Sequence, residues 1–283
     1  MRLKIERDTE TGFCFGVKRA IDIVTEKART LGRVETLGAI VHNRPVLREL
    51  AGMGVRIAEN VEDIRGDVIA TSAHGISPDI ERELRGRHID VVSTVCPFVQ
   101  RAQLAAERLA EAGFYVVVYG DANHPEVEGV LGWAEGRGMA TLDESRVCQD
   151  ITSPYRIGIL SQTTQIPAHF TDFVKKVVEL ALTKDTEIRV IDTICHEIRR
   201  RQASAFELAG RVDAMLVVGG HNSANTSRLA RLCSRVTRAR LIETSEEIDP
   251  SWFEDGYSVG ITAGTSTSED AIEKVVTRLK ALS

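Results

Sequence analysis

The apolar residues of the chain recur in two alternating patterns, one typical of helices and one typical of strands. Apolar residues between positions 17 and 28 follow one another at helical spacing, and the pattern ends at Gly32. Similar helical patterns run over 97–113 and 196–210, and short runs rich in Val and Ile, such as 115–119, stand between them. This alternation predicts an α/β fold with mainly parallel sheets that helices cover on both faces.

The order of these signals repeats three times. Each third of the chain has a cysteine just before a predicted helix, at Cys14, Cys96 and Cys195. His42, His124 and His221 then follow these cysteines after 28, 28 and 26 residues. We therefore predict three small pseudo-equivalent α/β domains, residues 14–95, 96–192 and 193–283, with residues 1–13 packing onto the third. Ligands of open parallel sheets bind at the carboxyl ends of the strands, so we expect the domains to surround one central cavity.

Composition and charge narrow the classes of protein. The chain has 283 residues, of which 43% are hydrophobic and 27% charged, as in ordinary globular proteins. The net charge is -5 and the basic residues are scattered, so we expect no nucleic-acid partner. The N-terminus lacks the apolar core of a signal peptide, and no apolar run has the length of a membrane span. We therefore expect a cytoplasmic protein without a membrane partner.

The five cysteines should stay reduced in that compartment, and an odd number fits disulfides poorly. Cys233 lies on the apolar stripe of a predicted helix and reads as a core residue. Cys14, Cys96 and Cys195 each stand at a helix start, where unpaired N–H groups favour a thiolate. Three thiolates without a fourth protein ligand leave one metal position open, which suits a 4Fe-4S cluster with one exposed iron or a catalytic zinc that keeps a water. All-thiolate ligation favours iron and sulfur.

Several polar residues gather at predicted strand ends. They are His42, His74, Ser223, Asn225 and Ser266, and the last three also stand near predicted helix starts. Hydroxyls, imidazoles and free N–H groups at such places can bind a phosphate without a Walker loop or a dinucleotide motif, and the chain has neither. The plainer interpretation is that these residues are ordinary helix caps and surface histidines.

The string HPEVEG carries His124, Glu126 and Glu128. We expect an extended or turning segment here, in which alternate side chains point the same way. Glu126 is then a candidate proton donor, because an apolar surrounding and a neighbouring anion would raise the pKa of its carboxyl group. Thr163, in the string SQTT, is placed to relay a proton. The alternative is a solvated turn.

Taken together, these strings resemble one enzyme family. They are GFCFGV with Cys14, VHN with His42, SAHG with His74, CP with Cys96, HPEVEG with His124 and Glu126, SQTT with Thr163 and Thr164, TIC with Cys195, NSANTSRL with Ser223 and Asn225, and TAGTS with Ser266. In this order, from about residue 12 to about residue 270, they resemble the 4-hydroxy-3-methylbut-2-enyl diphosphate reductases of the non-mevalonate isoprenoid pathway. HPEVEG and NSANTSRL are the most specific of these strings.

The resemblance implies a function for each group of residues. The family removes an allylic hydroxyl reductively to give isopentenyl and dimethylallyl diphosphates. By this likeness Cys14, Cys96 and Cys195 hold one 4Fe-4S cluster with an open iron. His42, His74, Thr164, Ser223, Asn225 and Ser266 would bind the diphosphate substrate, and His124, Glu126 and Thr163 would move protons. Reduced ferredoxin or flavodoxin would supply electrons, since the chain has no flavin or nicotinamide motif.

The chain also departs from the family's usual strings. Ser93, Thr94 and Val95 precede the second cysteine, His196, Glu197 and Ile198 follow the third, and His221 and Ala224 stand where Lys and Ser are usual. These changes lie close to the expected pocket. They leave open a paralogue with the same cluster chemistry and a different substrate. A zinc-dependent hydrolase of a phosphorylated metabolite and a non-catalytic anion-binding module are the other interpretations.

Overall fold

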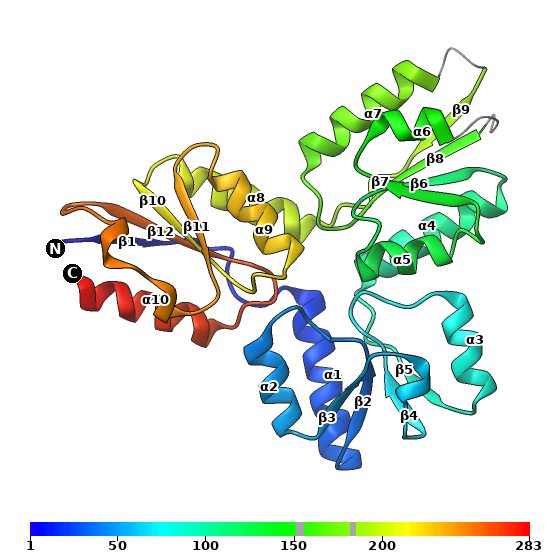
Figure 1. Cartoon of the computed structure of the whole chain (residues 1–283), viewed down its shortest axis with the longest axis horizontal. Coiled ribbons are helices and arrows are strands. Elements are labelled where there is room, and N and C mark those ends of the chain that lie inside the picture. The colour runs from blue at the N-terminus through cyan, green and yellow to red at the C-terminus, as the bar shows by residue number, and fades with distance from the viewer. Residues whose placement is uncertain (151–155, 182–184) are drawn as a thin grey trace. The chain divides into compact units, whose positions relative to one another are not determined.

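The chain forms three four-stranded sheets, each flanked by helices (Figure 1). A computed structural model describes residues 1–150, 156–181 and 185–283, without the side chains of residues 148 and 150. Every strand pair within these residues is parallel, which confirms the predicted α/β class. In the same residues, no helix combines the length and apolar character that a bilayer crossing requires.

The chain divides into two compact units. The first unit consists of Met1–Lys18, Val41–Glu49 and His196–Ser283, and the second of Arg19–Ile40 and Leu50–Cys195. The division into three domains with boundaries near residues 95 and 192 stays a prediction.

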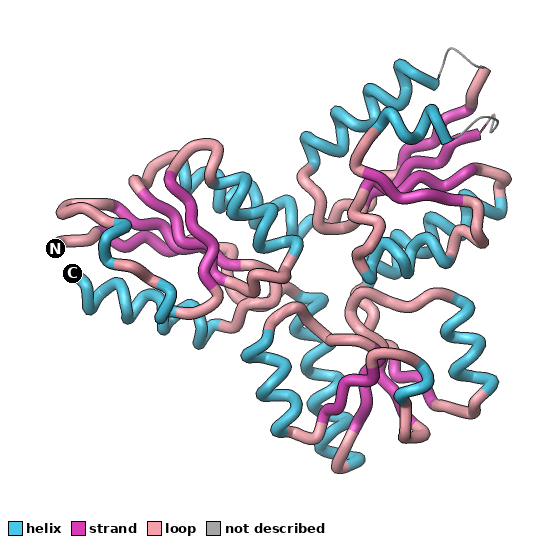
Figure 2. The backbone as a smooth tube through the Cα atoms, in the orientation of Figure 1, coloured by secondary structure: helices cyan, strands magenta, loops and turns pink. Residues whose placement is uncertain are grey.

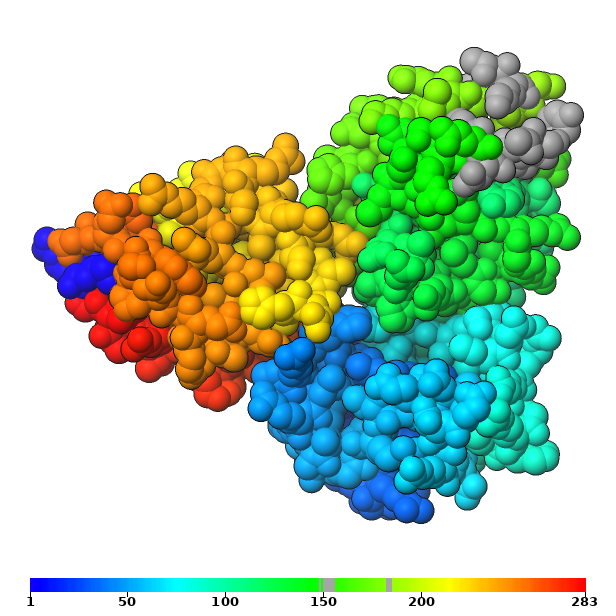
Figure 3. All heavy atoms as spheres, in the orientation of Figure 1, coloured from blue at the N-terminus to red at the C-terminus, as the bar shows by residue number. Residues whose placement is uncertain are grey.

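The first unit contains one sheet. Its strands are β1 (Lys4–Arg7), β10 (Ala214–Val218), β11 (Arg238–Ile242) and β12 (Ser258–Ala263), and its helices are α8 (His196–Ala209), α9 (Ala224–Cys233) and α10 (Glu269–Leu282). Strand β1 pairs with β12 in register Lys4↔Ser258. The first residues of the chain therefore pack among its last residues, as the dark blue, orange and red atoms of Figure 3 show.

The second unit contains the other two sheets. One has β2 (Val34–Leu37), β3 (Val55–Ala58), β4 (Val68–Ala70) and β5 (Asp90–Val92), with helix α3 (Pro78–Gly86). The other has β6 (Tyr115–Tyr119), β7 (Gly138–Thr141), β8 (Arg156–Ser161) and β9 (Glu187–Val190), with α4 (Pro97–Glu111), α5 (Pro125–Gly132), α6 (Glu144–Asp150) and α7 (Pro167–Ala181). Helices α1 (Phe15–Leu31) and α2 (Arg44–Gly52) each contain residues of both units.

All three sheets share one strand order. The first sheet of the second unit runs β3-β2-β4-β5, the second runs β7-β6-β8-β9, and the sheet of the first unit runs β11-β10-β12-β1. We number as strand 1 the strand that follows the helix after each cysteine, which is β2, β6 or β10. The next two strands along the chain are strands 2 and 3, and the strand that precedes a cysteine (β5, β9 or β1) is strand 4. Each sheet then has the order 2-1-3-4. In such an order the chain turns to opposite sides of strand 1, and the switch point lies between strands 1 and 3. The repeat that the sequence predicts is thus a repeat of topology.

The central strands β6, β8, β10 and β12 are buried on both faces along most of their length, because helices cover both sides of their sheets (Figure 2). The edge strands β1, β5 and β9 are partly exposed. In β10, Ala214, Leu216 and Val218 pack on the side of α10, whereas Met215 and Val217 pack against α8 and α9. Successive side chains of a strand point to opposite faces, so both sets must be apolar. This explains the continuous apolar run AMLVV.

Helices α4 and α7 cover the sheet that contains β6. Val116 and Val118 lie in one core with residues of α4 and α5. On the other side, the Tyr119 ring meets Phe170 and Phe173 of α7 at centroid distances of 5.8 and 4.7 Å. The core is filled closely enough that Gly158 of β8 has no room for a side chain.

We expect Gly158→Ala to destabilise the fold. A Cβ atom at this position would lie 2.7 and 2.9 Å from the two Cδ atoms of Leu109, a buried residue of α4. Such overpacking costs typically about 1–3 kcal/mol of unfolding free energy, measured by urea unfolding. Gly86→Ala is the matched control, since a Cβ there meets nothing within 4 Å. Equal unfolding midpoints for the two variants would contradict this account of the packing.

Candidate active site

The predicted site residues follow the strands that flank the three switch points. His42 comes after β2 and His74 after β4, His124 after β6 and Thr163 and Thr164 after β8, and Ser223 and Asn225 after β10 and Ser266 after β12. The carboxyl ends of these strands are where open parallel sheets bind ligands. The structure therefore places each of these residues in a segment that follows such a strand.

Each of the three cysteines occupies the same place relative to a sheet. Cys14, Cys96 and Cys195 follow the edge strands β1, β5 and β9, and each directly precedes a helix. Their backbone N–H groups donate to the carbonyls of Thr265, Ala73 and Thr163 at 3.0, 3.1 and 3.0 Å. Each of these carbonyls belongs to the loop after strand 3 of its sheet. A single hydrogen bond therefore ties each cysteine to a switch point.

The environment of Cys14 opposes a free thiolate. Burial raises the pKa of this thiol, although the Val17 N–H, at 3.5 Å from Sγ, and the charge of Arg201 lower it. The helix start does favour the anion, as predicted, but desolvation outweighs it. A thiolate at Cys14 consequently needs a positive partner such as a bound metal.

Cys233 behaves as the core residue that its helical position predicts. It is fully buried in the cluster that α8, β10 and α9 share. Burial, assisted by the charge of Asp8, raises its pKa to about 12. Four of the five cysteines are described as free thiols, and the Cys148 side chain lies outside the described residues.

In the first unit, the loop after β12 brings several predicted residues together. The Thr265 carbonyl accepts from Cys14, and the Thr265 hydroxyl accepts from Asn225 Nδ2 at 3.3 Å. The neighbouring Ser266 carbonyl accepts from Asn43 Nδ2 at 2.8 Å. Ser223 is the N-cap of α9, with Oγ accepting from Thr226 N at 3.3 Å. Hydroxyl and amide groups thus gather at the strand ends of this unit.

His42 lies in a loop rather than directly at a strand end. Strand β2 stops at Leu37 because Gly38 takes a φ of +73°, a conformation that ends an extended strand. The His42 carbonyl packs against Gly220, where a Cβ atom would come within 2.7 Å of it. Burial lowers the pKa of the His42 imidazole. The ring is therefore held in its neutral form at neutral pH.

The expectation of an extended HPEVEG segment is wrong. This string opens α5, with His124 as the N-cap and Pro125 as the first helical residue. Proline suits that position, since its missing N–H has no partner in the first turn anyway. Glu126 and Glu128 therefore lie on different sides of a helix. Glu126 is 2% exposed, whereas Glu128 faces solvent.

Glu126 and Thr163 form a buried pair in the second unit. Thr163 N donates to Glu126 Oε1 at 2.6 Å, and Thr163 Oγ1 donates to Oε2 at 2.9 Å. The Thr163 carbonyl in turn accepts from Cys195 N. Hydrogen bonds therefore link the Glu126 carboxyl group, Thr163 and the backbone of Cys195. A hydroxyl that can both donate and accept beside a buried carboxyl group is suited to proton transfer.

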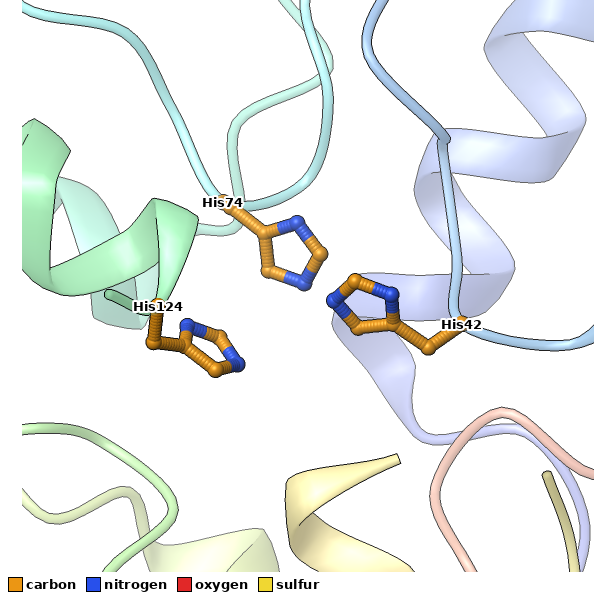
Figure 4. A group of neighbouring side chains, drawn as sticks. All are labelled: His42, His74 and His124. Carbon is orange, nitrogen blue, oxygen red and sulfur yellow. The ribbon is translucent and has the colours of Figure 1, made fainter. Parts of the chain in front are cut away.

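The His74 and His124 rings meet edge to face. Their centroids are 5.3 Å apart at an interplanar angle of 88°. Figure 4 labels both rings. His124 Nδ1 accepts from Glu126 N at 3.2 Å, so the neutral ring carries its hydrogen on Nε2. This assigns the tautomer of His124.

Helix α5 also positions the loop that carries His74. Trp133 Nε1 and Gln103 Nε2 both donate to the Ile76 carbonyl, at 3.1 and 3.4 Å. The glycines of α5 let the loop approach: a Cβ at Gly129 would lie 3.5 Å from the His74 carbonyl, and a Cβ at Gly132 would lie 2.3 Å from Ser77 Cβ. The ring contact between His74 and His124 depends on this close packing.

Sequence reasoning overlooked some residues of the site. Asn43 is 6% exposed, binds the Ser266 carbonyl and accepts from Val46 N at 3.1 Å. Its position just before α2 was the available signal, because Asn is a favoured N-cap. Gln103 and Arg201 are also buried, at 3% and 4% exposure, yet both read as surface positions of amphipathic helices. Only tertiary packing distinguishes these two residues from the exposed polar residues of the same helices.

The residues that depart from the family strings lie in different environments. Ile198 is 1% exposed and packs in the interior. Glu197 pairs with Arg200 at 3.0 Å, and His221 Nε2 pairs with Glu247 at 2.9 Å. Ala224 is the first residue of α9, directly after the Ser223 cap. Of these, Ala224 is the change closest to a predicted substrate ligand.

Each parallel sheet has polar residues next to its switch point and a cysteine tied to the same loop by a backbone hydrogen bond. These features define an α/β protein with cysteine-containing sites at its strand ends. A family model described as LytB protein matches residues 5–280. The chain belongs to the LytB protein family.

Its relatives carry one name. A 4-hydroxy-3-methylbut-2-enyl diphosphate reductase of Dehalococcoides mccartyi (strain CBDB1) is 54% identical over 282 residues, which are 99% of this chain and 99% of the relative. The reductase of that name from Geobacter metallireducens (strain ATCC 53774 / DSM 7210 / GS-15) is 41% identical over 270 residues, with 95% of this chain and 94% of the relative covered.

Solved structures agree with this likeness. The structure of (E)-4-hydroxy-3-methyl-but-2-enyl diphosphate reductase, the terminal enzyme of the non-mevalonate pathway, has a TM-score of 0.72 and 36% identity, and covers 99% of this chain and 100% of its own. The Plasmodium falciparum E-1-hydroxy-2-methyl-but-2-enyl-4-diphosphate reductase has a TM-score of 0.89 at 24% identity, covers 98% of this chain and 88% of its own, and supports the fold alone.

We expect Gly132→Ala to displace the His74 loop. The added methyl group would overlap Ser77, so the loop and the ring of His74 must move away from α5. Histidine ring signals in long-range ¹H–¹⁵N spectra should shift for His74 and His124, and Gly86→Ala should leave them in place. Unchanged ring signals in Gly132→Ala would show that α5 does not position this loop.

Proposed function

We propose that this chain reduces 4-hydroxy-3-methylbut-2-enyl diphosphate to isopentenyl and dimethylallyl diphosphates. The reaction consumes two electrons and two protons. The allylic C–O bond breaks, one proton leaves with the oxygen as water, and the other ends on the carbon skeleton. The names of the relatives, together with their nearly complete coverage of the chain, support this substrate.

The observation that carries the proposal is the equivalent placement of three cysteines. Cys14, Cys96 and Cys195 are each joined to the loop after strand 3 of a sheet, in the region where the predicted substrate ligands also lie. Cysteines that only fill a core would not be expected to recur at equivalent positions of three sheets. The repeat supports a shared role for the three thiols.

These thiols fit a 4Fe-4S cluster as the resident group. None of the three is in a disulfide, each stands at a helix start, and the partly buried Cys14 needs a positive partner to ionise. We propose that Cys14, Cys96 and Cys195 are its three ligands. When bound, the cluster supplies electrons and an open iron that acts as a Lewis acid toward the substrate hydroxyl.

Glu126 and Thr163 are proposed to deliver the proton to the leaving oxygen. The hydroxyl of Thr163 can reverse its hydrogen bond: when Glu126 is protonated, its O–H donates to Thr163 Oγ1, which can then donate its own hydrogen onward. The 2.9 Å contact between them supports this relay. His124 holds Glu126 N through Nδ1 and presents a hydrogen on Nε2 to the substrate's hydroxymethyl group.

The diphosphate ligands are proposed to be His42, His74, Thr164, Ser223, Asn225 and Ser266. Ser223 caps α9, whose free N–H groups and dipole favour an anion. Asn225 and Ser266 belong to the same network of hydrogen bonds around Thr265. An imidazole that takes up a proton would add a positive charge.

The electron donor is proposed to be reduced ferredoxin or flavodoxin. One-electron carriers of this kind suit a chain whose sequence has no flavin or nicotinamide motif. We also propose that the enzyme works in the cytoplasm, where its thiols stay reduced until they are metallated.

Anaerobic reconstitution with iron and sulfide, followed by an assay with a dithionite-reduced dye, tests the proposal. We expect a brown protein that converts 4-hydroxy-3-methylbut-2-enyl diphosphate to both products. A colourless protein that holds zinc and hydrolyses a phosphorylated metabolite would refute it. A brown protein without turnover would instead favour the paralogue that the Ala224 substitution leaves open.

We expect Glu126→Gln to remove most of the activity while the cluster remains. An amide cannot donate the proton of a carboxylic acid, and the loss of general acid catalysis costs about 10²–10⁴-fold in kcat. Iron content and visible absorption should match the wild type. Glu128→Gln, in the same motif but exposed, should leave kcat unchanged. Equal turnover in both variants would rule out Glu126 as the proton donor.

We expect pyrophosphate to bind more tightly as the pH falls from 8 to 6. Burial lowers the pKa of His42, so the free imidazole is neutral, whereas a bound anion favours the imidazolium. Binding should therefore take up a proton, which calorimetry in buffers of different ionisation enthalpy measures. The His42→Asn variant should take up fewer protons, and the exposed His88→Asn control should not differ from the wild type. Identical proton uptake in all three proteins would exclude His42 as a ligand.

A further inference from the structure

Arg201 is a buried cation in the middle of α8. Its side chain is 4% exposed, and among the described residues it forms no ion pair. Nη1 donates to the Glu10 carbonyl at 3.0 Å, and Nε has no hydrogen-bond partner within the described parts of the chain. A buried charge without an opposite charge beside it costs free energy. A guanidinium that is buried and unpaired therefore indicates that it interacts with an anion.

The surroundings of Arg201 lead to Cys14. Residues 8–14 form the loop between β1 and α1, here named the Cys14 loop. Ser204, one turn after Arg201, donates to Asp8 at the start of this loop, and Thr262 of β12 donates to the same carboxylate at 2.6 Å. The loop ends where Cys14 N binds Thr265. Arg201 and Ser204 therefore present one face of α8 to the loop that holds the thiol.

The charge of Arg201 reaches the sulfur of Cys14. The guanidinium of Arg201 and the carboxylate of Glu197, one turn earlier on α8, both act electrostatically on Cys14, with opposite signs. Arg200 lies next to Arg201 but is exposed, and it is neutralised by Glu10 and Glu197 at 3.2 and 3.0 Å. Two adjacent arginines thus differ in burial and in pairing.

We propose that Arg201 is a positioning residue that stabilises the negative charge on Cys14 and on the iron–sulfur centre bound to it, and thereby raises the reduction potential of that centre. This inference rests on the proposed function, since it presupposes the cluster. Reduction adds one negative charge, and a buried cation stabilises the more negative state more strongly.

The experiment measures the midpoint potential of the reconstituted cluster by redox titration with an electron paramagnetic resonance readout. Arg201→Gln removes the charge and keeps an N–H donor. We expect it to shift the equilibrium about tenfold toward the oxidised cluster, a decrease of about 59 mV for a one-electron couple. Arg200→Gln removes the same charge from an exposed and paired site, and we expect no change.

Two further variants keep the test decisive. Arg201→Lys retains the charge, so its potential should stay near the wild-type value, including in the case that Arg201→Gln fails to fold or to load iron. Glu197→Gln removes the opposing charge and should raise the potential. Potentials in Arg201→Gln equal to the wild type, or a decrease in Arg201→Lys as large as a tenfold shift, would overturn the assignment. A wild-type protein that forms no cluster would instead contradict the proposed function.

Discussion

One hydrogen bond, formed three times, determines where the thiols of this protein stand. In each case the N–H of a cysteine binds a carbonyl in the loop after strand 3. The cysteine follows an edge strand, and this bond ties its backbone to a loop beside the switch point. The backbone position of each cysteine is therefore set by its own sheet.

Much of the fold was predictable because its elements are periodic over short distances. The stripe of Ala20, Val24 and Ala28 in α1 is buried as the helical spacing indicates, and the helices after the three cysteines begin where the strings place them. The HPEVEG segment was misread because α5 has only eight residues, too few to show a clear helical period. Pro125 at the first helical position was the better signal.

The sequence could not show whether a polar residue of an amphipathic helix faces solvent or is buried against another segment. Gln103 and Arg201 sit among residues that look alike in the sequence, and only the segment that packs against them decides that they are buried. The same applies to Cys14. Its helix start predicts a stabilised thiolate, yet the cost of removing the sulfur from water is larger, and that cost depends on residues far along the chain.

The pairing of β1 with β12 imposes an order on the assembly of the chain. Lys4 pairs with Ser258, so an edge strand of the first unit's sheet is supplied by a segment that is synthesised long before β12. Until β12 emerges, β1 has no neighbour to pair with, and Cys14, seven residues beyond it, cannot reach its carbonyl on Thr265. Contacts of such high sequence separation form late. The backbone of Cys14 can therefore take its final place only after β12 has been synthesised.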